Sequence, residues 1–323
     1  MSRRARTGNR QAPTAGPKGG TARAPRLHVQ FLGTSAATPD LRSNTSAMLL
    51  ACGTDRVLID CGAHAVAQLK KAGIAPASLS MVAITHWHSD HASGIPSLVR
   101  ALPSTRGAGH LGRAPLHIYG PQPPAAIGGV INLLVRQGRI QFHAVGPGGQ
   151  IQMANGTLQA IPGDHTITSM GWKFHEAGPR PRHILFSGDT RPSSAILEAA
   201  RGCDLLVHEG TFSTARSRWA HRIGHSTAGQ AALVAHLAGA GALAITHISR
   251  KESATQILAE AREVYAGAIL PSEFELLTVH PQSATVTRQP AAGGNFRHNW
   301  ARITRRKIAG SRRPCAGRPE VAA

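Results

Sequence analysis

The chain has 323 residues, 41% of them hydrophobic, which is long enough for one large or two small folded domains with a packed core. Its formal net charge of +20 lies mainly at the ends, because residues 1–26 carry +7, residues 281–323 carry +8 and residues 27–280 only +5. No apolar run reaches the ~18 residues of a transmembrane helix, and no apolar segment of a secretory signal follows the N-terminus, so neither a membrane protein nor a secreted one is expected.

The basic ends favour a polyanionic partner such as RNA, with solvated, disordered tails as the alternative explanation. The four cysteines are widely spaced, which argues against a disulfide framework or a cysteine-based zinc knuckle and favours the reducing cytoplasm. They are Cys52, Cys61, Cys203 and Cys315. An Arg-rich, acid-poor N-terminus is also compatible with an organelle transit peptide.

Residues 1–26 lack hydrophobic periodicity and are predicted to be a disordered basic tail. Order begins with an alternating strand at 27–32, followed by a hairpin whose two strands meet at the turn Gly53-Thr54-Asp55. The helices predicted next, in chain order, are 65–71, 95–101, 125–135, 194–200, 226–237 and 255–264. The strands predicted after the hairpin are 81–84, 117–119, several within 140–174, then 183–186, 204–207, 242–245, 267–270 and 275–279.

A strand-rich part followed by helix–strand alternation occurs twice along this chain. Two mixed sheets packed face to face, with helices outside, account for that order best. The predicted fold class is therefore α/β, a four-layer αββα sandwich over residues 27–280. Residues 281–323 are predicted to form a second disordered basic tail.

Four metal-ligand side chains fall within six residues after the apolar run 81–84: His86, His88, Asp90 and His91. A strand ending there would direct His86 and His88 to one side, with Asp90 and His91 in the turn that follows. This arrangement suits two metal ions, and imidazole with carboxylate favours zinc, with manganese or iron as alternatives. A loop of surface histidines is the competing explanation.

Further ligand-type residues follow predicted strands far along the chain: His165, Asp189 and His247. A carboxylate such as Asp189, placed after Gly188, can bridge two cations. Two cations hold a shared water as hydroxide, and Asp90 can both bind metal and accept the proton of that water. The leaving oxygen needs a separate acid, for which His225 is the candidate, held in its charged form by Glu209.

These motifs resemble the metallo-β-lactamase superfamily, and within it the ribonuclease Z branch of tRNA 3′-processing endonucleases. The superfamily resemblance rests on H-x-H-x-D-H at 86–91 with His165, Asp189 and His247. The branch resemblance rests on longer strings: Phe31-Leu32-Gly33-Thr34-Ser35, Phe186-Ser187-Gly188-Asp189-Thr190-Arg191, Val207-His208-Glu209-Gly210-Thr211-Phe212, His225-Ser226-Thr227 and Leu243-Ala244-Ile245-Thr246-His247-Ile248-Ser249. It covers residues 27–280.

The resemblance implies a metallo-β-lactamase fold with two zinc ions. One zinc would be held by His86, His88 and His165, and the other by Asp90, His91 and His247, with Asp189 between them. It also implies Asp90 as general base, the His225–Glu209 pair serving the leaving group, and removal of 3′ trailers from precursor tRNA by a homodimer. Predicted substrate contacts are Arg42 and Asn44, from the string Pro39-Asp40-Leu41-Arg42-Ser43-Asn44, and Ser226.

Three features depart from the branch. Ser89 replaces the usual glycine before the Asp of the cluster, and the Arg42 loop lacks the usual lysine. About nine residues, 175–183, stand where the branch has a protruding tRNA-gripping arm. Ser89 and the missing arm favour a second hypothesis, a small-molecule hydrolase of the same fold (arylsulfatase-like, cyclic-nucleotide phosphodiesterase or lactonase-like), which the His225-Ser226-Thr227 and Glu209 motifs oppose. A third, an RNA-binding protein without catalysis, is opposed by the filled ligand positions.

Overall fold

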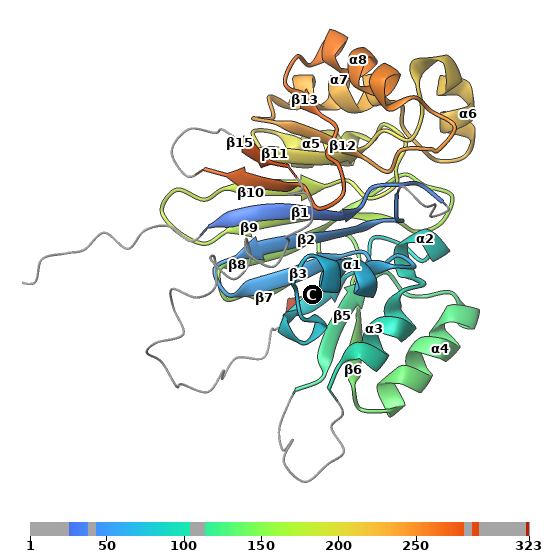
Figure 1. Cartoon of the computed structure of the whole chain (residues 1–323), viewed down its shortest axis with the longest axis vertical. Helices are drawn as coiled ribbons and strands as arrows, with labels where there is room; N and C mark the ends of the chain where they lie inside the picture. The colour runs from blue at the N-terminus through green and yellow to red at the C-terminus, as the bar shows by residue number, and fades with distance from the viewer. Residues whose placement is uncertain (1–25, 38–42, 104–113, 281–285, 291–320, 323) are drawn as a thin grey trace, which may run out of the picture.

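The computed structural model describes residues 26–37, 43–103, 114–280, 286–290 and 321–322. Two β-sheets lie in the middle of the molecule, with helices outside them (Figure 1). Most of both predicted tails, and Arg42, lie outside the described residues. In the part of the chain that is described, no helix is both long enough and apolar enough to cross a bilayer.

The first sheet has the strand order β15-β14-β1-β2-β3-β4-β5-β6. Its first half pairs antiparallel, whereas β3 to β6 run parallel. The strands are β1 (Leu27–Gly33), β2 (Ala47–Cys52), β3 (Asp55–Ile59), β4 (Met81–Ala83), β5 (Leu116–Gly120), β6 (Ile140–Ala144), β14 (Leu276–Val279) and β15 (Val286–Gln289).

The second sheet has the strand order β13-β12-β11-β10-β9-β8-β7-β16. Strands β10 to β13 are parallel, and β7 to β10 pair antiparallel in succession. The strands are β7 (Gln150–Met153), β8 (Gly156–Pro162), β9 (Met170–Glu176), β10 (His183–Phe186), β11 (Leu205–Glu209), β12 (Leu243–Thr246), β13 (Ala268–Ile269) and β16 (Val321–Ala322).

Helices cover the outer face of each sheet. Those of the first half are α1 (Ala65–Lys71), η1 (Pro76–Ser78), α2 (Ser89–Ala92), α3 (Ile95–Ala101) and α4 (Ala125–Arg136). Those of the second half are α5 (Ser194–Ala200), η2 (Thr214–Arg216), α6 (Ser217–Arg222), α7 (Ala228–Ala238) and α8 (Ala254–Val264). Figure 1 shows α3 and α4 at the lower right of the molecule and α6 to α8 at its top.

Three hydrophobic clusters hold these four layers together. One lies between the sheets and takes Val57 and Ile59 from the first and Ile184 and Phe186 from the second. Leu58 points the other way, into a cluster with α1, α3 and α4, whereas Leu185 packs with α5, α7 and α8. Because both faces of the central strands are covered, these strands are hydrophobic throughout, without the polar alternation of a half-exposed sheet. The predicted αββα sandwich is confirmed.

The structure differs from the sequence prediction at several places, among them the short helices α2 and α6, which were not predicted. The helix predicted from Ser226 begins at Ala228, because Thr227 caps it in a reciprocal pair of hydrogen bonds with Gln230. Beyond residue 280, β15 adds a strand to β14, inside the segment predicted as a basic tail. Arg288 of this strand forms an ion pair with the buried Glu275 carboxylate, 2.5 Å away. The division into one domain and two tails otherwise stays a prediction.

Candidate metal centre

The predicted ligands gather at one rim of the sandwich because several strands end there. Strands β10, β11 and β12 are parallel, and β8 runs the same way as β10 because each pairs antiparallel with β9. Residues that follow the carboxyl ends of such strands meet at one edge. In this way β8 is followed by His165, β10 by Asp189 and β12 by His247, while Glu209 ends β11.

His86 and His88 were predicted to follow each other on a strand, and the structure corrects this prediction. β4 ends at Ala83, and the backbone then turns because Thr85 N donates to Asp60 Oδ1 (2.8 Å) and Thr85 O accepts from Met170 N (2.9 Å). His86 and His88 lie in the loop, and Asp90 and His91 in the first turn of α2. Their side chains nevertheless point into one space.

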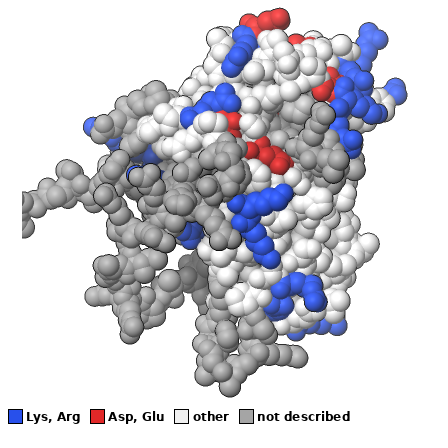
Figure 2. Space-filling model, in the orientation of Figure 1, with Lys and Arg blue, Asp and Glu red and all other residues white. Residues whose placement is uncertain are grey.

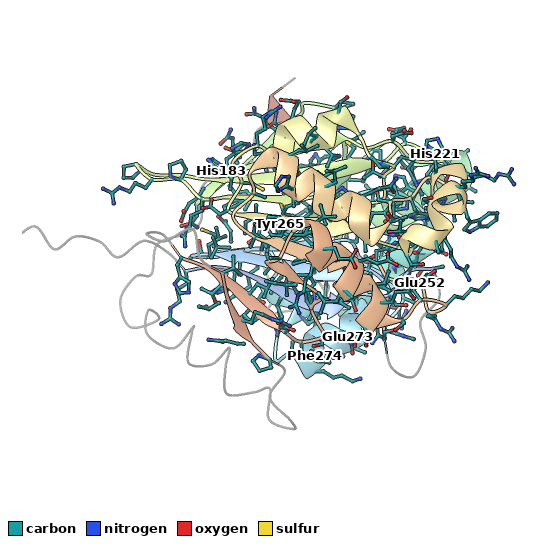
Figure 3. The ribbon with its side chains drawn as sticks, turned by 90° about the horizontal axis from the view of Figure 1, so that it is seen from above. His183, His221, Glu252, Tyr265, Glu273 and Phe274 are labelled. Carbon is teal, nitrogen blue, oxygen red and sulfur yellow. The ribbon has the colours of Figure 1, made fainter. Side chains whose placement is uncertain are left out.

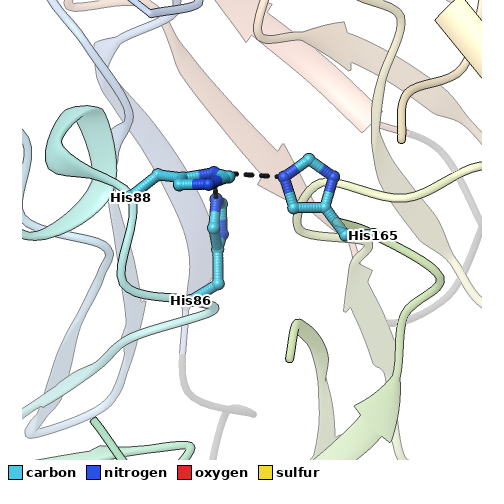
Figure 4. Close-up of side chains that lie close together, drawn as sticks. All are labelled: His86, His88 and His165. Atoms are coloured by element: carbon cyan, nitrogen blue, oxygen red, sulfur yellow. Dashed lines mark hydrogen bonds between the residues drawn. The ribbon is translucent and has the colours of Figure 1, made fainter. Parts of the chain in front are cut away.

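His86, His88 and His165 form the first group of potential ligands (Figure 4). His88 Nδ1 lies 3.0 Å from His86 Nε2 and 3.1 Å from His165 Nε2. Two of these imidazoles come from a loop of the first sheet and one from a strand end of the second. A cation bound between their three nitrogens would take a lone pair from each.

Asp90, His91 and His247 form the second group. His247 Nε2 lies 3.2 Å from both His91 Nε2 and Asp90 Oδ2. The buried Asp189 Oδ2 lies between the two groups, 3.3 Å from His91 Nε2, 3.4 Å from His247 Nε2 and 3.6 Å from His86 Nε2. The structure therefore brings all seven predicted ligands together, with one carboxylate oxygen within reach of both groups.

In four of the imidazoles, the ring nitrogen that faces away from the other ligands already has a hydrogen-bond partner; we call it the outer nitrogen. His86 Nδ1 lies 3.0 Å from Thr85 Oγ1, and His91 Nδ1 lies 2.7 Å from Asp60 Oδ2. His165 Nδ1 meets Gly224 O at 2.7 Å, and His247 Nδ1 meets Thr211 Oγ1 at 2.9 Å. In a neutral ring that donates through this outer nitrogen, the inner nitrogen is left with a lone pair that can bind a metal. This donor set fits a metal ion.

Protonation of the first group agrees with that arrangement, whereas His91 differs: burial opposes its charge, but the Asp189 and Asp60 carboxylates raise its pKa well above the usual value. Burial lowers the pKa of His86 well below its usual value, and burial also lowers the pKa of His88 and His165. For Asp189, burial opposes ionisation, but the imidazoles of His247, His91 and His86 hold the pKa of the carboxyl group well below its usual range. Neutral imidazole and ionised carboxylate are the forms that bind metal.

Asp60 and Thr211 were not predicted from the sequence as part of the site. Asp60 ends the hairpin at β3 and accepts hydrogen bonds from Thr85 N and Thr85 Oγ1 as well as contacting His91. Only its position could have indicated this role in the sequence, because a carboxylate at the end of β3 adjoins the end of the parallel strand β4. Thr211 is the threonine of the string 207–212, two residues beyond Glu209.

His225 and Glu209 form a pair beside the ligand groups. His225 Nδ1 lies 2.9 Å from Glu209 Oε1 and 3.9 Å from Asp189 Oδ2. Glu209 is itself held by hydrogen bonds from Thr190 N and Thr211 Oγ1. Although burial opposes the charge, the Glu209 carboxylate raises the pKa of His225 to about 9. The imidazole is therefore protonated at neutral pH, which is the state required of a general acid.

Two local features keep this rim in shape. Gly188 has φ +61°, and a Cβ there would lie 2.7 Å from Met170 O and 3.0 Å from Thr85 Cβ, so the approach of β10 to the histidine loop requires glycine. Trp87 is buried, donates from Nε1 to Pro121 O at 2.7 Å and packs edge-on against Phe142. It is therefore a packing residue at the rim.

Asn44 and Ser226, two of the predicted substrate contacts, both form hydrogen bonds within the protein. Asn44 donates to the Glu273 carboxylate, and its Oδ1 lies 2.9 Å from His64 Nδ1. Ser226 is fully buried, and its hydroxyl donates to Thr190 O at 2.8 Å, so it supports the loop behind Asp189. Neither contact offers support for a role in substrate binding, which stays a prediction for both residues.

Comparison with known proteins agrees with this geometry. A family model described as a beta-lactamase superfamily domain matches residues 55–248. The ribonuclease Z of Myxococcus xanthus is 31% identical over 298 residues, which cover 75% of this chain and 94% of the relative. Among solved structures, the short form of human tRNase Z is 26% identical with a TM-score of 0.62, covering 77% of this chain and 98% of that one.

The metallo-beta-lactamase fold protein YhfI from Bacillus subtilis is 22% identical, with a TM-score of 0.70 over 78% of this chain and 99% of that chain, which shows the shared fold. The chain therefore belongs to the metallo-β-lactamase superfamily, in its ribonuclease Z branch. Its His and Asp clusters are consistent with a metal-binding site in an enzyme of the hydrolase class.

Replacing Asp60 with asparagine is expected to weaken metal binding by roughly 10- to 100-fold, because the carboxylate that orients His91 and increases its basicity is lost. Asparagine keeps the size of the side chain and tolerates the φ of +58° at this position. Competition with a chromophoric chelator measures the affinity. Asp55→Asn is the matched control, since Asp55 caps the turn at Asn155 away from the ligands. Equal affinities in both variants would contradict the assignment.

Proposed function

We propose that this protein is a metal-dependent endoribonuclease of ribonuclease Z type that removes 3′ trailers from precursor tRNA. The observation that carries the proposal is the His225–Glu209 pair beside the ligand groups, 2.9 Å apart. Breaking a phosphodiester of RNA expels a ribose oxygen, which is a poor leaving group unless it is protonated. The printed names of the relatives, ribonuclease Z and tRNase Z, supply the RNA substrate.

Two divalent cations would be held by the residues in hand. His86, His88 and His165 would bind one, Asp90, His91 and His247 the other, with Asp189 shared. Imidazole with carboxylate favours zinc, with manganese or iron as alternatives. When bound, such a pair supplies an activated water and neutralises negative charge at the attacked phosphate.

Asp90 and His225 then carry out the two proton transfers of the reaction. Asp90 accepts the proton of the attacking water, and its Oδ2 is positioned by a hydrogen bond from Ala37 N at 2.8 Å. His225 donates a proton to the leaving ribose oxygen. Glu209 does not touch substrate in this scheme, and it keeps the imidazole oriented and charged.

The basic tails, the cytoplasmic location and the homodimer belong to this proposal as well. A charge of +15 outside residues 27–280 favours contact between the tails and RNA. The homodimer is implied by the resemblance alone.

A small-molecule hydrolase is the second candidate, and one observation favours it. The connection between β9 and β10 consists of the six residues 177–182, where the resemblance places a tRNA-gripping arm. Arg182 in this connection is buried, and it forms an ion pair with Glu176 and donates to Val279 O. A substrate smaller than tRNA, such as an aryl sulfate, a cyclic nucleotide or a lactone, would need no such arm.

Incubation of the purified protein with a precursor tRNA bearing a 3′ trailer distinguishes the candidates. We expect cleavage after the discriminator base, lost on addition of a chelator and restored by zinc, because the proposed reaction depends on bound cations. Gel electrophoresis of end-labelled RNA identifies the cut. An intact RNA, with chelator-sensitive turnover of a bis-aryl phosphate or an aryl sulfate, would favour the small-molecule hydrolase instead.

A further inference from the structure

Helix α6 exposes an aromatic side chain between two arginines. Arg218, Trp219 and Arg222 are all exposed, and Trp219 is 49% accessible. The other tryptophans among the described residues, Trp87 and Trp172, are buried and donate hydrogen bonds to carbonyl groups of the backbone. An exposed tryptophan flanked by cations is the combination with which proteins bind single-stranded nucleic acid, through stacking and phosphate contacts.

The charge around Trp219 is positive and partly uncompensated. Residues 214–224 contain three arginines and no acid. Arg216 lies 3.1 Å from Glu252, whereas the described part of the chain records no ion pair for Arg218 or Arg222. Figure 2 shows Lys and Arg side chains gathered at the upper right, over the place that α6 occupies in Figure 1.

The helix is anchored directly to the catalytic loops. His225 N donates to Ala220 O at 2.9 Å, and Arg191 Nε donates to His221 O at 2.6 Å. Gly224, two residues beyond the helix, accepts from the metal-site residue His165. These bonds hold α6 in a defined position next to the proposed acid and the first ligand group.

The views of the molecule agree with these bonds. In Figure 1, α6 lies at the same edge as α2, which carries Asp90 and His91. Seen from above in Figure 3, His221 of α6 and Glu252 lie toward that same edge. Helix α6, with its exposed residues, therefore lies next to the rim that carries the metal-site residues.

We propose that α6 binds the single-stranded segment of the RNA substrate next to the scissile bond, with a base stacked on Trp219 and phosphates bound by Arg218 and Arg222. The inference rests on the proposed ribonuclease function and names a substrate contact for it. With only six residues joining β9 to β10, a grip placed beside the active site takes over part of the role of an arm.

The test compares Trp219→Ala, Trp219→Phe and Arg218→Ala/Arg222→Ala with the wild type. Affinity for a single-stranded RNA of about 12 nucleotides is measured by fluorescence anisotropy at several salt concentrations, beside kcat/KM for precursor tRNA. Trp219→Ala is expected to weaken binding about 5- to 150-fold, and Trp219→Phe far less, because phenylalanine still stacks. The double arginine variant is expected to reduce the slope of log affinity against log salt by about 1.4.

Matched controls lie on the helices of the other sheet. Leu133→Ala removes an exposed hydrophobic side chain of α4, and Arg100→Ala/Arg136→Ala removes the same charge from α3 and α4. Losses in the α6 variants that match those of the controls would overturn the inference. So would equal losses on RNA and on a bis-aryl phosphate, since α6 would then act through His225 and His165. Failure of the wild type to cleave precursor tRNA would instead count against the proposed function.

Discussion

Replacing Asp90 with alanine is expected to lower the turnover of both precursor tRNA and a bis-aryl phosphate by about 1000-fold or more. Asp90 Oδ2 lies 3.2 Å from His247 Nε2 and 3.5 Å from His91 Nε2, so the change removes a proposed metal ligand. It also removes the proposed general base, whose contribution alone is roughly 100- to 10,000-fold. Steady-state rates on the two substrates measure the loss, and metal content by atomic emission shows how much of it follows from lost cation.

Glu263→Ala is the matched control for this variant, because Glu263 is an exposed carboxylate on α8. It removes the same charge, and we expect rates within about twofold of the wild type, as for most surface substitutions. An Asp90→Ala protein with near-normal turnover on either substrate would exclude Asp90 from the mechanism. A small-molecule hydrolase would need Asp90 in the same way. This variant therefore tests the metal centre, whereas the cleavage assay with precursor tRNA tests the substrate.

Replacing His225 with alanine is expected to affect the two substrates unequally. On precursor tRNA the loss should be about 100- to 10,000-fold, the usual contribution of a general acid. On a bis-aryl phosphate carrying nitro groups the loss should be only a few-fold, because the nitrophenolate anion leaves without a proton. His236→Ala, an exposed histidine on α7, is the control. Equal losses on both substrates would mean that His225 acts on the metal centre and not on the leaving group.

The pH dependence of RNA cleavage gives a second measure of the same residue. The pKa of His225 is raised to about 9, so the acid is present at neutral pH and is lost as the pH rises through that value. We expect an alkaline limb near pH 9 for precursor tRNA that is absent for the nitrophenyl ester. In Glu209→Gln the carboxylate that raises this pKa is gone, so the limb should move to lower pH. An unchanged limb in this variant would contradict the pairing.

Much of the fold follows from local patterns. Helix α1 has the predicted bounds, 65–71, since a short apolar run between Gly62 and Gly73 leaves little choice. The central strands were predicted because hydrophobic runs such as His183–Phe186 are short and bounded by polar turns. The start of α7 was placed two residues early, because the side chain of Thr227, and not the apolar periodicity, sets it. The strand β15 was missed, because its pairing with β14 lies in a segment of basic composition.

For the site, local sequence was enough to identify the ligand types. The three histidines and one aspartate within six residues indicate a metal site without knowledge of the fold, and Asp189 and His247 lie in recognisable strings. Tertiary structure decided what holds those ligands. Asp60 and Thr211 reach His91 and His247 because β3 and β4, and β11 and β12, are parallel neighbours whose ends meet at one rim. The position of α6 beside that rim likewise depends on the contacts of Arg191 with His221 and of His165 with Gly224, which no spacing in the chain reveals, because they form only after distant strands have paired.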